Sequence, residues 1–146
     1  MSRELWDSAK KIVQELGEEI ERNGPNIRIE QPGLGWQYGG KFLQDRTERL
    51  KAEMRTKGYN VLACTVFHFS KNAKILNPTK HYILLPIEGS SMLKPTERPL
   101  SKLQAHIIHD EPVLESNGGV NMICMALEGE HGEKKVGRDV EIECVE

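Results

Sequence analysis

The first hydrophobic pattern along the chain is helical. Apolar residues recur at spacings of three and four from Leu5 to Ile20, and charged side chains fill most positions between them. This spacing is typical of an amphipathic helix that buries one face. We expect the helix to begin near Ser2, a favourable N-cap, and to end at Asn23-Gly24-Pro25, because glycine accepts a left-handed backbone and proline cannot continue the helix.

A second helical pattern covers Lys41 to Lys57. Its apolar stripe is narrow and consists of Leu43, Leu50 and Met54, while most other positions are charged. The segment Gly58-Tyr59-Asn60 interrupts the pattern, since glycine and asparagine favour turns. The N-terminal part of the chain therefore predicts two helices.

After the second helix the pattern changes from helical to extended. Val61–Phe69 is apolar at nearly every position, as in a strand that is covered on both faces. The next strand, His81–Ile87, contains Pro86, which cannot donate a ladder hydrogen bond and favours a position near a sheet edge. The last segment, Val140–Cys144, alternates apolar residues with glutamates, which indicates a strand with one wet face.

The remaining segments carry turn signals or fit two structures. Val113–Glu115 and Val120–Leu127 fit the arms of a hairpin joined by Ser116–Gly119, because an Asn-Gly pair suits a tight turn. Glu88–Pro99 is rich in Ser, Pro and Gly, which predicts a loop long enough to act as a lid over a binding site. Leu100–His109 fits a helix and a strand equally well.

These elements place the chain in the α+β class. A length of 146 residues is typical of one domain, so residues 1–146 are expected to share one core. Two helices followed by a run of strands favour two N-terminal helices packed on a mainly antiparallel sheet of about five strands. The order of the strands does not follow from the pattern.

Composition adds expectations about the environment of the protein. The apolar runs fall well short of the roughly 18 residues of a membrane span, and the N-terminus has no signal-peptide pattern. Cys64, Cys124 and Cys144 are far apart and show no zinc-binding spacing, so we interpret them as buried free thiols in a reducing compartment. The sequence thus predicts a soluble, cytoplasmic protein.

Charge is distributed unevenly along the chain. Residues 24–110 carry thirteen Lys and Arg against seven Asp and Glu, a net of +6, whereas residues 111–146 carry three against nine, a net of −6. The basic middle suits an anionic ligand or an acidic partner surface. It is also consistent with contact to the acidic end of the same chain, or of a second copy in a homo-oligomer.

A glycine-rich segment with aromatic residues precedes the second helix. Gly33–Lys41 contains four glycines, two aromatic residues and a lysine, and such a turn at a helix N-terminus presents backbone N–H groups and a partial positive charge to a phosphate. The spacing Gly35-x-x-x-x-Gly40-Lys41 matches the first part of a nucleotide-binding P-loop, but Phe42 stands where the magnesium-binding Ser or Thr belongs. We therefore do not expect a P-loop NTPase. The segment fits either a tightly turned surface loop with Trp36 and Tyr38 packed under the core, or a non-catalytic anion site.

The candidate ligand-binding residues lie in this segment and in the helix after it. They are Trp36, Tyr38, Gly39, Gly40, Lys41, Arg46 and Arg49. Nucleic acid is a less favoured ligand, because base-stacking aromatic residues do not alternate with the basic residues of the helix, several of which can pair with nearby carboxylates. The predicted ligand is a nucleotide-like anion or an acidic protein surface, and the sequence identifies no cofactor.

A histidine cluster supports an alternative, enzymatic interpretation. On a helix, His106 and His109 would lie on one side and, with Asp110, could bind a metal ion or share acid–base work. On a strand, the two rings would point to opposite faces. The sequence thus leaves two hypotheses: a small regulatory binding protein of the immunity or phage-accessory type, and a small metal-dependent phosphoesterase that uses the histidine cluster.

Overall fold

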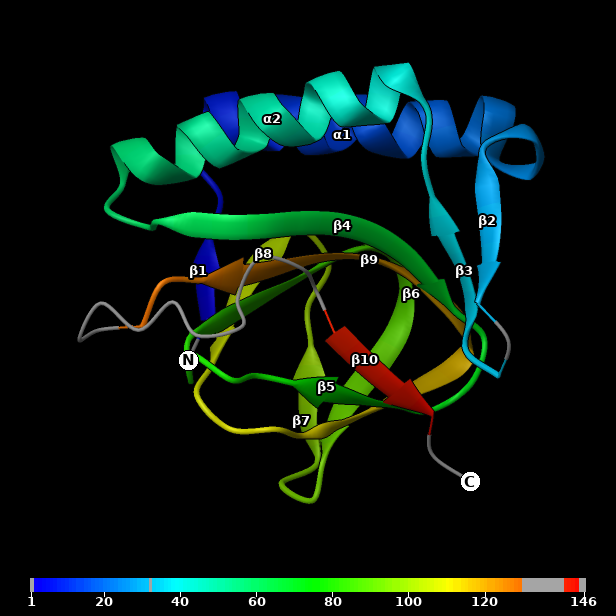
Figure 1. Ribbon diagram of the computed structural model, residues 1–146, viewed down its shortest axis with the longest axis vertical. Coiled ribbons are helices and arrows are strands. Elements are labelled where there is room, and N and C mark those ends of the chain that lie inside the picture. Colours follow the sequence, from blue (N-terminus) through cyan, green and yellow to red (C-terminus); the bar gives the residue numbers. More distant parts are fainter. Residues whose placement is uncertain (1, 32, 130–140, 145–146) are drawn as a thin grey trace.

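The protein has three layers of secondary structure. The computed structural model describes residues 2–31, 33–129 and 141–144. Two antiparallel helices form the first layer, and one antiparallel sheet, folded back on itself, forms the other two (Figure 1). The predicted α+β class, with two N-terminal helices packed on an antiparallel sheet, is confirmed.

The helices form close to the periodic patterns that predict them. Helix α1 spans Asp7–Asn23 and α2 spans Lys41–Thr56. Helix α1 begins later than expected, because Ser2–Glu4 forms the edge strand β1 and Trp6 is the N-cap. A short 3-10 turn, η1 (Gly24–Asn26), follows α1 at the predicted helix end.

The strands are more numerous than the sequence pattern indicates. They are β1 (Ser2–Glu4), β2 (Arg28–Gln31), β3 (Gly35–Tyr38), β4 (Val61–Phe69), β5 (Ala73–Leu76), β6 (Tyr82–Lys94), β7 (Arg98–Leu100), β8 (Gln104–Ile108), β9 (Val113–Leu127) and β10 (Glu141–Cys144). Their pairings are antiparallel throughout the described residues. The described part of the sheet thus has ten strands where about five were predicted.

Two long strands connect the halves of the folded sheet. The main half has the order β1-β8-β6-β9-β4-β3-β2, while β7 pairs with β6, β5 with β9, and β10 with β5. Strands β6 and β9 pass through both halves, and their register shifts between Gly89 and Ser90. Gly89, Gly118 and Gly119 have φ angles of 101°, 78° and 101° at this bend, and glycine adopts such angles without steric cost.

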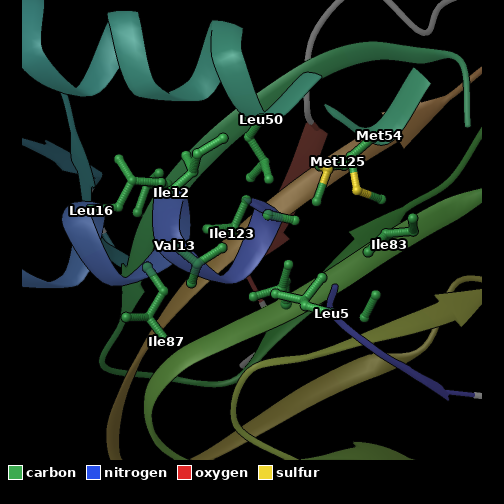
Figure 2. Packing of buried hydrophobic residues seen from close by; sticks show 14 of the residues in the cluster. Leu5, Ile12, Val13, Leu16, Leu50, Met54, Ile83, Ile87, Ile123 and Met125 are labelled. Atoms are coloured by element: carbon green, nitrogen blue, oxygen red, sulfur yellow. The ribbon is translucent and has the colours of Figure 1, made fainter. Parts of the chain in front are cut away.

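An apolar core lies on each face of the main half of the sheet. The helix-side core, shown in Figure 2, lies between the helices and the sheet. Its principal members are Leu5, Ile12, Val13, Leu16, Leu50, Met54, Ile83, Ile87, Ile123 and Met125. The inter-sheet core lies between the two halves of the folded sheet. Its principal members are Phe67, Phe69, Ile75, Tyr82, Leu84, Leu114, Met122 and Cys124.

Three expectations about the strands are wrong. Glu88–Pro99 is not a lid-like loop, because β6 continues to Lys94 and forms a hairpin with β7. Ser116–Gly119 is not a hairpin turn, because β9 passes through it without reversing direction. Pro86 does not end its strand at a sheet edge, because β6 continues to Lys94. The pairs between β6 and β8 stop at Leu84, and the proline lies just before a shift of register against β9.

The segment that fitted both a helix and a strand is extended, and so is the last described segment of the chain. Leu100–His109 contains the end of β7 and all of β8, so its helical alternative is wrong. Glu141–Cys144 forms the predicted last strand, whereas Val140 and the side chain of Cys144 lie outside the described residues. Within the described ranges, no helix is long and apolar enough to cross a membrane.

Candidate functional site

Strand β3 covers only part of the edge of β4. It pairs with the second part of β4, from Tyr38 opposite Val66 to Gly35 opposite Phe69. The first part of β4, from residue 61 to residue 65, has no neighbour on that side among the described strands. This segment is the open edge of β4.

The open edge offers backbone hydrogen-bonding groups. Ser70, the residue after β4, donates its N–H to the Leu34 carbonyl at 2.9 Å. Because the direction alternates along a strand, every second residue of β4 before Ser70 points its backbone polar groups to the side on which β3 lies. The alternation places the backbone N–H and C=O of Cys64 at the open edge, beyond the end of β3. Exposed groups of this kind can bond a ligand or a further strand.

Gly39 and Gly40 carry the chain from β3 into α2. Gly40 is the N-cap and has a φ of 96°, a left-handed conformation that favours glycine. No side chain of the described residues caps the helix, and the first helical hydrogen bond runs from Gln44 N–H to the Gly40 carbonyl at 3.0 Å. The N–H groups of the three residues before Gln44 therefore have no partner inside the helix.

The uncapped helix and the open edge border a pocket of about 500 Å³, here called the α2 pocket. Its walls come from the first turns of α2, the end of β3 and the open edge of β4, with one residue of β2 at the side. The lining residues are Ile29, Gln37, Tyr38, Gly39, Gly40, Lys41, Leu43, Gln44, Thr47, Glu48, Cys64, Thr65 and Val66. Of the predicted ligand residues, the four from Tyr38 to Lys41 line this pocket.

Lys41 supplies a positive charge to the α2 pocket. Its side chain is exposed, and no carboxylate of the described residues forms an ion pair with it. The nearest carboxylates of α2 have other partners, because Glu48 lies 3.3 Å from Lys51 and Asp45 lies 3.2 Å from Arg49. Lys41 is therefore available to an anion.

Arg46 and Arg49 do not line the α2 pocket. The guanidinium carbon of Arg46 lies 4.2 Å from the centroid of the Phe42 ring, and its Nε lies 3.4 Å from a carboxylate oxygen of Glu15 on α1. Arg49 pairs with Asp45 along the surface of α2. Arg46 thus joins α2 to α1, Arg49 pairs within α2, and neither lines the pocket.

Trp36 also lies outside the lining of the α2 pocket. Its indole stacks on the ring of His68, with 4.2 Å between centroids and 10° between planes. Arg28, from the strand on the other side of β3, lies over the indole at 4.5 Å from its centroid. A nucleobase would have to displace one of these groups to stack on Trp36.

Burial keeps the phenol and the thiol of the pocket wall neutral. Tyr38 is 7% exposed, and its hydroxyl donates to Asn121 Oδ1 at 3.1 Å. Burial raises the pKa of Tyr38, and it raises the pKa of the Cys64 thiol to about 12. Neither group therefore carries a negative charge near neutral pH that would repel an anion.

Several lining residues were not predicted from the sequence. Gln44 and Thr47 follow Lys41 at successive spacings of three, so the helical period could have placed all three on one face. Gln37 and Cys64 carry no such local signal. They reach the pocket because β3 separates from β4 at that point, which depends on the pairing of distant segments.

The structure does not bring the predicted histidine cluster together. His106 lies on β8, is 2% exposed, and accepts a hydrogen bond from Ser101 N–H at 2.8 Å through Nε2. His109 lies beyond the end of β8, is exposed, and donates from Nδ1 to the Lys80 carbonyl at 2.9 Å. Across residues 2–31, 33–129 and 141–144, no group of three or more His, Cys, Asp or Glu side chains could hold a metal ion.

Comparison with known proteins adds no further information about the pocket. No family model, no curated protein and no solved structure matched this chain. The functional argument therefore depends on the geometry of the α2 pocket.

Proposed function

We propose that this chain is a non-catalytic binding protein that holds a small, nucleotide-like anion in the α2 pocket. One observation carries the proposal: a cavity of about 500 Å³ opens onto the uncapped N-terminus of α2, with Lys41 at its side. Small-molecule sites commonly have volumes of roughly 300–1,000 Å³. The cavity is therefore large enough for the ligand.

The first turn of α2 has the physical properties of an anion site. The N-terminus of a helix carries the equivalent of about half a positive charge, and its free N–H groups can donate to anionic oxygens. Lys41 adds a full positive charge, and the first turn contains no acidic residue. The side chains of Gln37, Gln44 and Thr47 can bond the uncharged part of a ligand.

The lining residues support binding more than chemistry. Among the described residues, the lining contains no histidine, and its single carboxylate, Glu48, is paired with Lys51. The Cys64 thiol has a raised pKa, whereas a nucleophilic cysteine needs a lowered one. These features favour a site that holds its ligand unchanged.

A small anion fits the site better than an acidic protein surface does. The available positive charge lies at the side of a cavity, where a flat protein surface makes poor contact. Arg46 and Arg49, which would widen the basic surface, already have carboxylate partners on α1 and α2. The acidic end of a flexible partner would use the same contacts as a small ligand.

Titration with inorganic phosphate and with a set of nucleoside phosphates tests the proposal. Calorimetry or NMR should detect saturable binding, and Lys41→Ala should weaken it about tenfold, since a charge-assisted contact is worth roughly 1–2 kcal/mol. Arg49→Ala is the matched control, because it removes one exposed cation from the same helix without altering the pocket. It should change the affinity less than about twofold.

Two results would overturn the proposed site. One is an affinity that Lys41→Ala leaves unchanged, which would place the anion elsewhere. The other is an equal loss in Lys41→Ala and Arg49→Ala, which would indicate attraction to net charge and not to the α2 pocket. A protein that binds none of the phosphates would refute the proposal altogether.

A further inference from the structure

Strand β2 ends the main half of the sheet, and one side of it has no neighbour among the described strands. It is the short sequence Arg28-Ile29-Glu30-Gln31. Ile29 is 58% exposed and is the only large apolar side chain that the described part of the chain leaves exposed. An uncovered strand edge with an exposed apolar side chain is a site where another strand can pair.

The outer edge of β2 presents the backbone groups of Arg28 and Glu30. Gly39 N–H donates to the Ile27 carbonyl at 2.7 Å, so Ile27 and every second residue after it direct their backbone groups toward β3. Ile29 therefore bonds inward to β3. The N–H and C=O groups of Arg28 and Glu30 point outward, away from the sheet.

The side chains of β2 are self-complementary. Arg28 and Glu30 lie on one face of the strand, and Ile29 lies on the other, because successive side chains alternate. Within one chain, Arg28 Nε lies 3.6 Å from a carboxylate oxygen of Glu30. A second β2 that runs antiparallel to the first, centred on Ile29, would also place Arg28 opposite Glu30 of the second copy, so that the four charges would alternate in sign. Both cation–carboxylate pairs would then lie on one face of the joined sheet, and the two Ile29 side chains would meet on the other face.

We propose that two copies of this protein associate through β2, with a two-fold axis at Ile29. The outward backbone groups make Arg28 and Glu30 of the second copy a hydrogen-bonded pair, which gives four hydrogen bonds across the axis. Ile29 and its counterpart form the non-hydrogen-bonded pair, in which Cα atoms approach to about 4.5 Å and side chains are closest. The main halves of the two sheets become one continuous sheet.

The other end of the sheet lacks this complementarity. Strand β1 is also an edge strand, but Ser2, Arg3 and Glu4 offer no apolar side chain to an opposing copy. An antiparallel pair centred on Arg3 would place Ser2 opposite Glu4 and the two arginines opposite each other, and like charges in that position are destabilising. The sequence thus favours self-pairing at β2 and not at β1.

The association is independent of the proposed anion site, although the two are neighbours. Ile29 also lines the α2 pocket, so the second copy would border the pocket without supplying its cation. A contact made by one short strand buries less than the roughly 1,200 Å² of a standard interface. We therefore expect a weak dimer with a dissociation constant between about 10 µM and 1 mM.

Sedimentation velocity over about 10 µM to 1 mM tests the dimer by charge reversal. Arg28→Glu and Glu30→Arg each place two like-charged pairs at the interface, so each should weaken the dimer at least about tenfold. The double variant R28E/E30R restores opposite charges and should return the dissociation constant to within about threefold of the original. Thermal unfolding of each variant, whose substitutions are on an exposed strand, verifies that the monomer is folded.

A backbone test separates strand pairing from charge attraction. Glu30→Ala and Glu30→Pro remove the same charge, but only proline also removes the outward N–H, and it leaves the bonds from β2 to β3 intact. The proline variant should dimerise at least about tenfold more weakly than the alanine variant. Three results would each overturn the proposal. They are equal dimerisation of these two variants, failure of the double charge reversal to restore association, and a wild-type protein that is still monomeric at about 1 mM.

Discussion

The two apolar cores share one sheet but differ in where they place polar groups. The helix-side core ends at the α2 pocket, where backbone N–H groups and Lys41 remain open to solvent. Near the inter-sheet core, two buried side chains bond to the backbone: Thr79 Oγ1 donates to the Leu127 carbonyl at 2.6 Å, and Asn77 Nδ2 donates to the Asp110 carbonyl at 3.1 Å. Asn77 Oδ1 and the Tyr82 hydroxyl have no hydrogen-bond partner among the described residues. Polar groups that are already bonded within the protein are not available to a ligand.

In this fold, a polar residue that is buried is therefore not by that fact a ligand-binding residue. His106 looks like a catalytic residue in the sequence, yet it is buried and bonded to the backbone of Ser101. Lys41 looks like an ordinary surface lysine, yet it stands beside an open cavity. The geometry around each residue, and not its type, decides what it can do.

The largest expected effects come from truncating one leucine in each core. Leu50 in the helix-side core and Leu84 in the inter-sheet core are both fully buried. Replacement by alanine should lower the free energy of unfolding by about 2–5 kcal/mol in each case, because it removes apolar burial and leaves a cavity. Urea denaturation measures the loss. A cost below about 1 kcal/mol at either site would show that this core is loosely packed.

A smaller effect is expected from pH, and it should arise in the inter-sheet region. Burial lowers the pKa of His106, so the folded protein disfavours the charged ring. The unfolded chain, with a histidine pKa of about 6.5, then binds more protons, and stability is lost as the pH falls from that value through the folded pKa. His106→Gln should reduce this loss between pH 7.5 and acidic pH in urea denaturation. An equal loss of unfolding free energy in His106→Gln would show that His106 is not the source of the pH dependence.

The smallest effect compares one cysteine from each side of the sheet. Cys64 lines the α2 pocket and Cys124 is fully buried in the inter-sheet core. Because the pKa of Cys64 is about 12, its alkylation should be slow at neutral pH and accelerate about tenfold per pH unit, whereas Cys124 stays unmodified in the folded protein. Mass spectrometry after iodoacetamide treatment measures both rates. Rapid labelling of Cys64 at pH 7 would show that its pKa is not raised.

The sequence predicts those elements that depend on local periodicity. The apolar spacing from Leu5 to Ile20 and the stripe of Leu43, Leu50 and Met54 give the two helices, and the dense apolar run of Val61–Phe69 gives β4. Each of these patterns spans enough residues to specify both a structure and a buried face. The α+β class follows from them.

The folding of the sheet could not be predicted from local patterns. Asn117-Gly118 favours a hairpin turn, but pairing with the second half of β6 holds the segment within a continuous, bent strand. The same pairing converts the predicted lid of Glu88–Pro99 into strand and hairpin. Local turn chemistry is therefore overridden by hydrogen bonds to residues far away in the sequence.

The candidate site shows the same division. The glycines before α2 predict a turn at a helix N-terminus, and this part of the site, Tyr38 to Lys41, lies together in the structure. Arg46 and Arg49 belong to the same basic helix, but net charge says nothing about which face a side chain occupies. The contribution of Cys64 depends on where β3 leaves β4, which no local pattern specifies.

The bend that β6 and β9 share couples the two halves of the sheet during unfolding. Both strands belong to both halves of the sheet, and the ladder between them crosses the bend from Tyr82 to Lys94. Within the described residues, the two halves of the sheet therefore share the hydrogen bonds of this one ladder. Partial opening at that ladder would expose the two hydrophobic interiors together, so the described structure should melt as one cooperative unit.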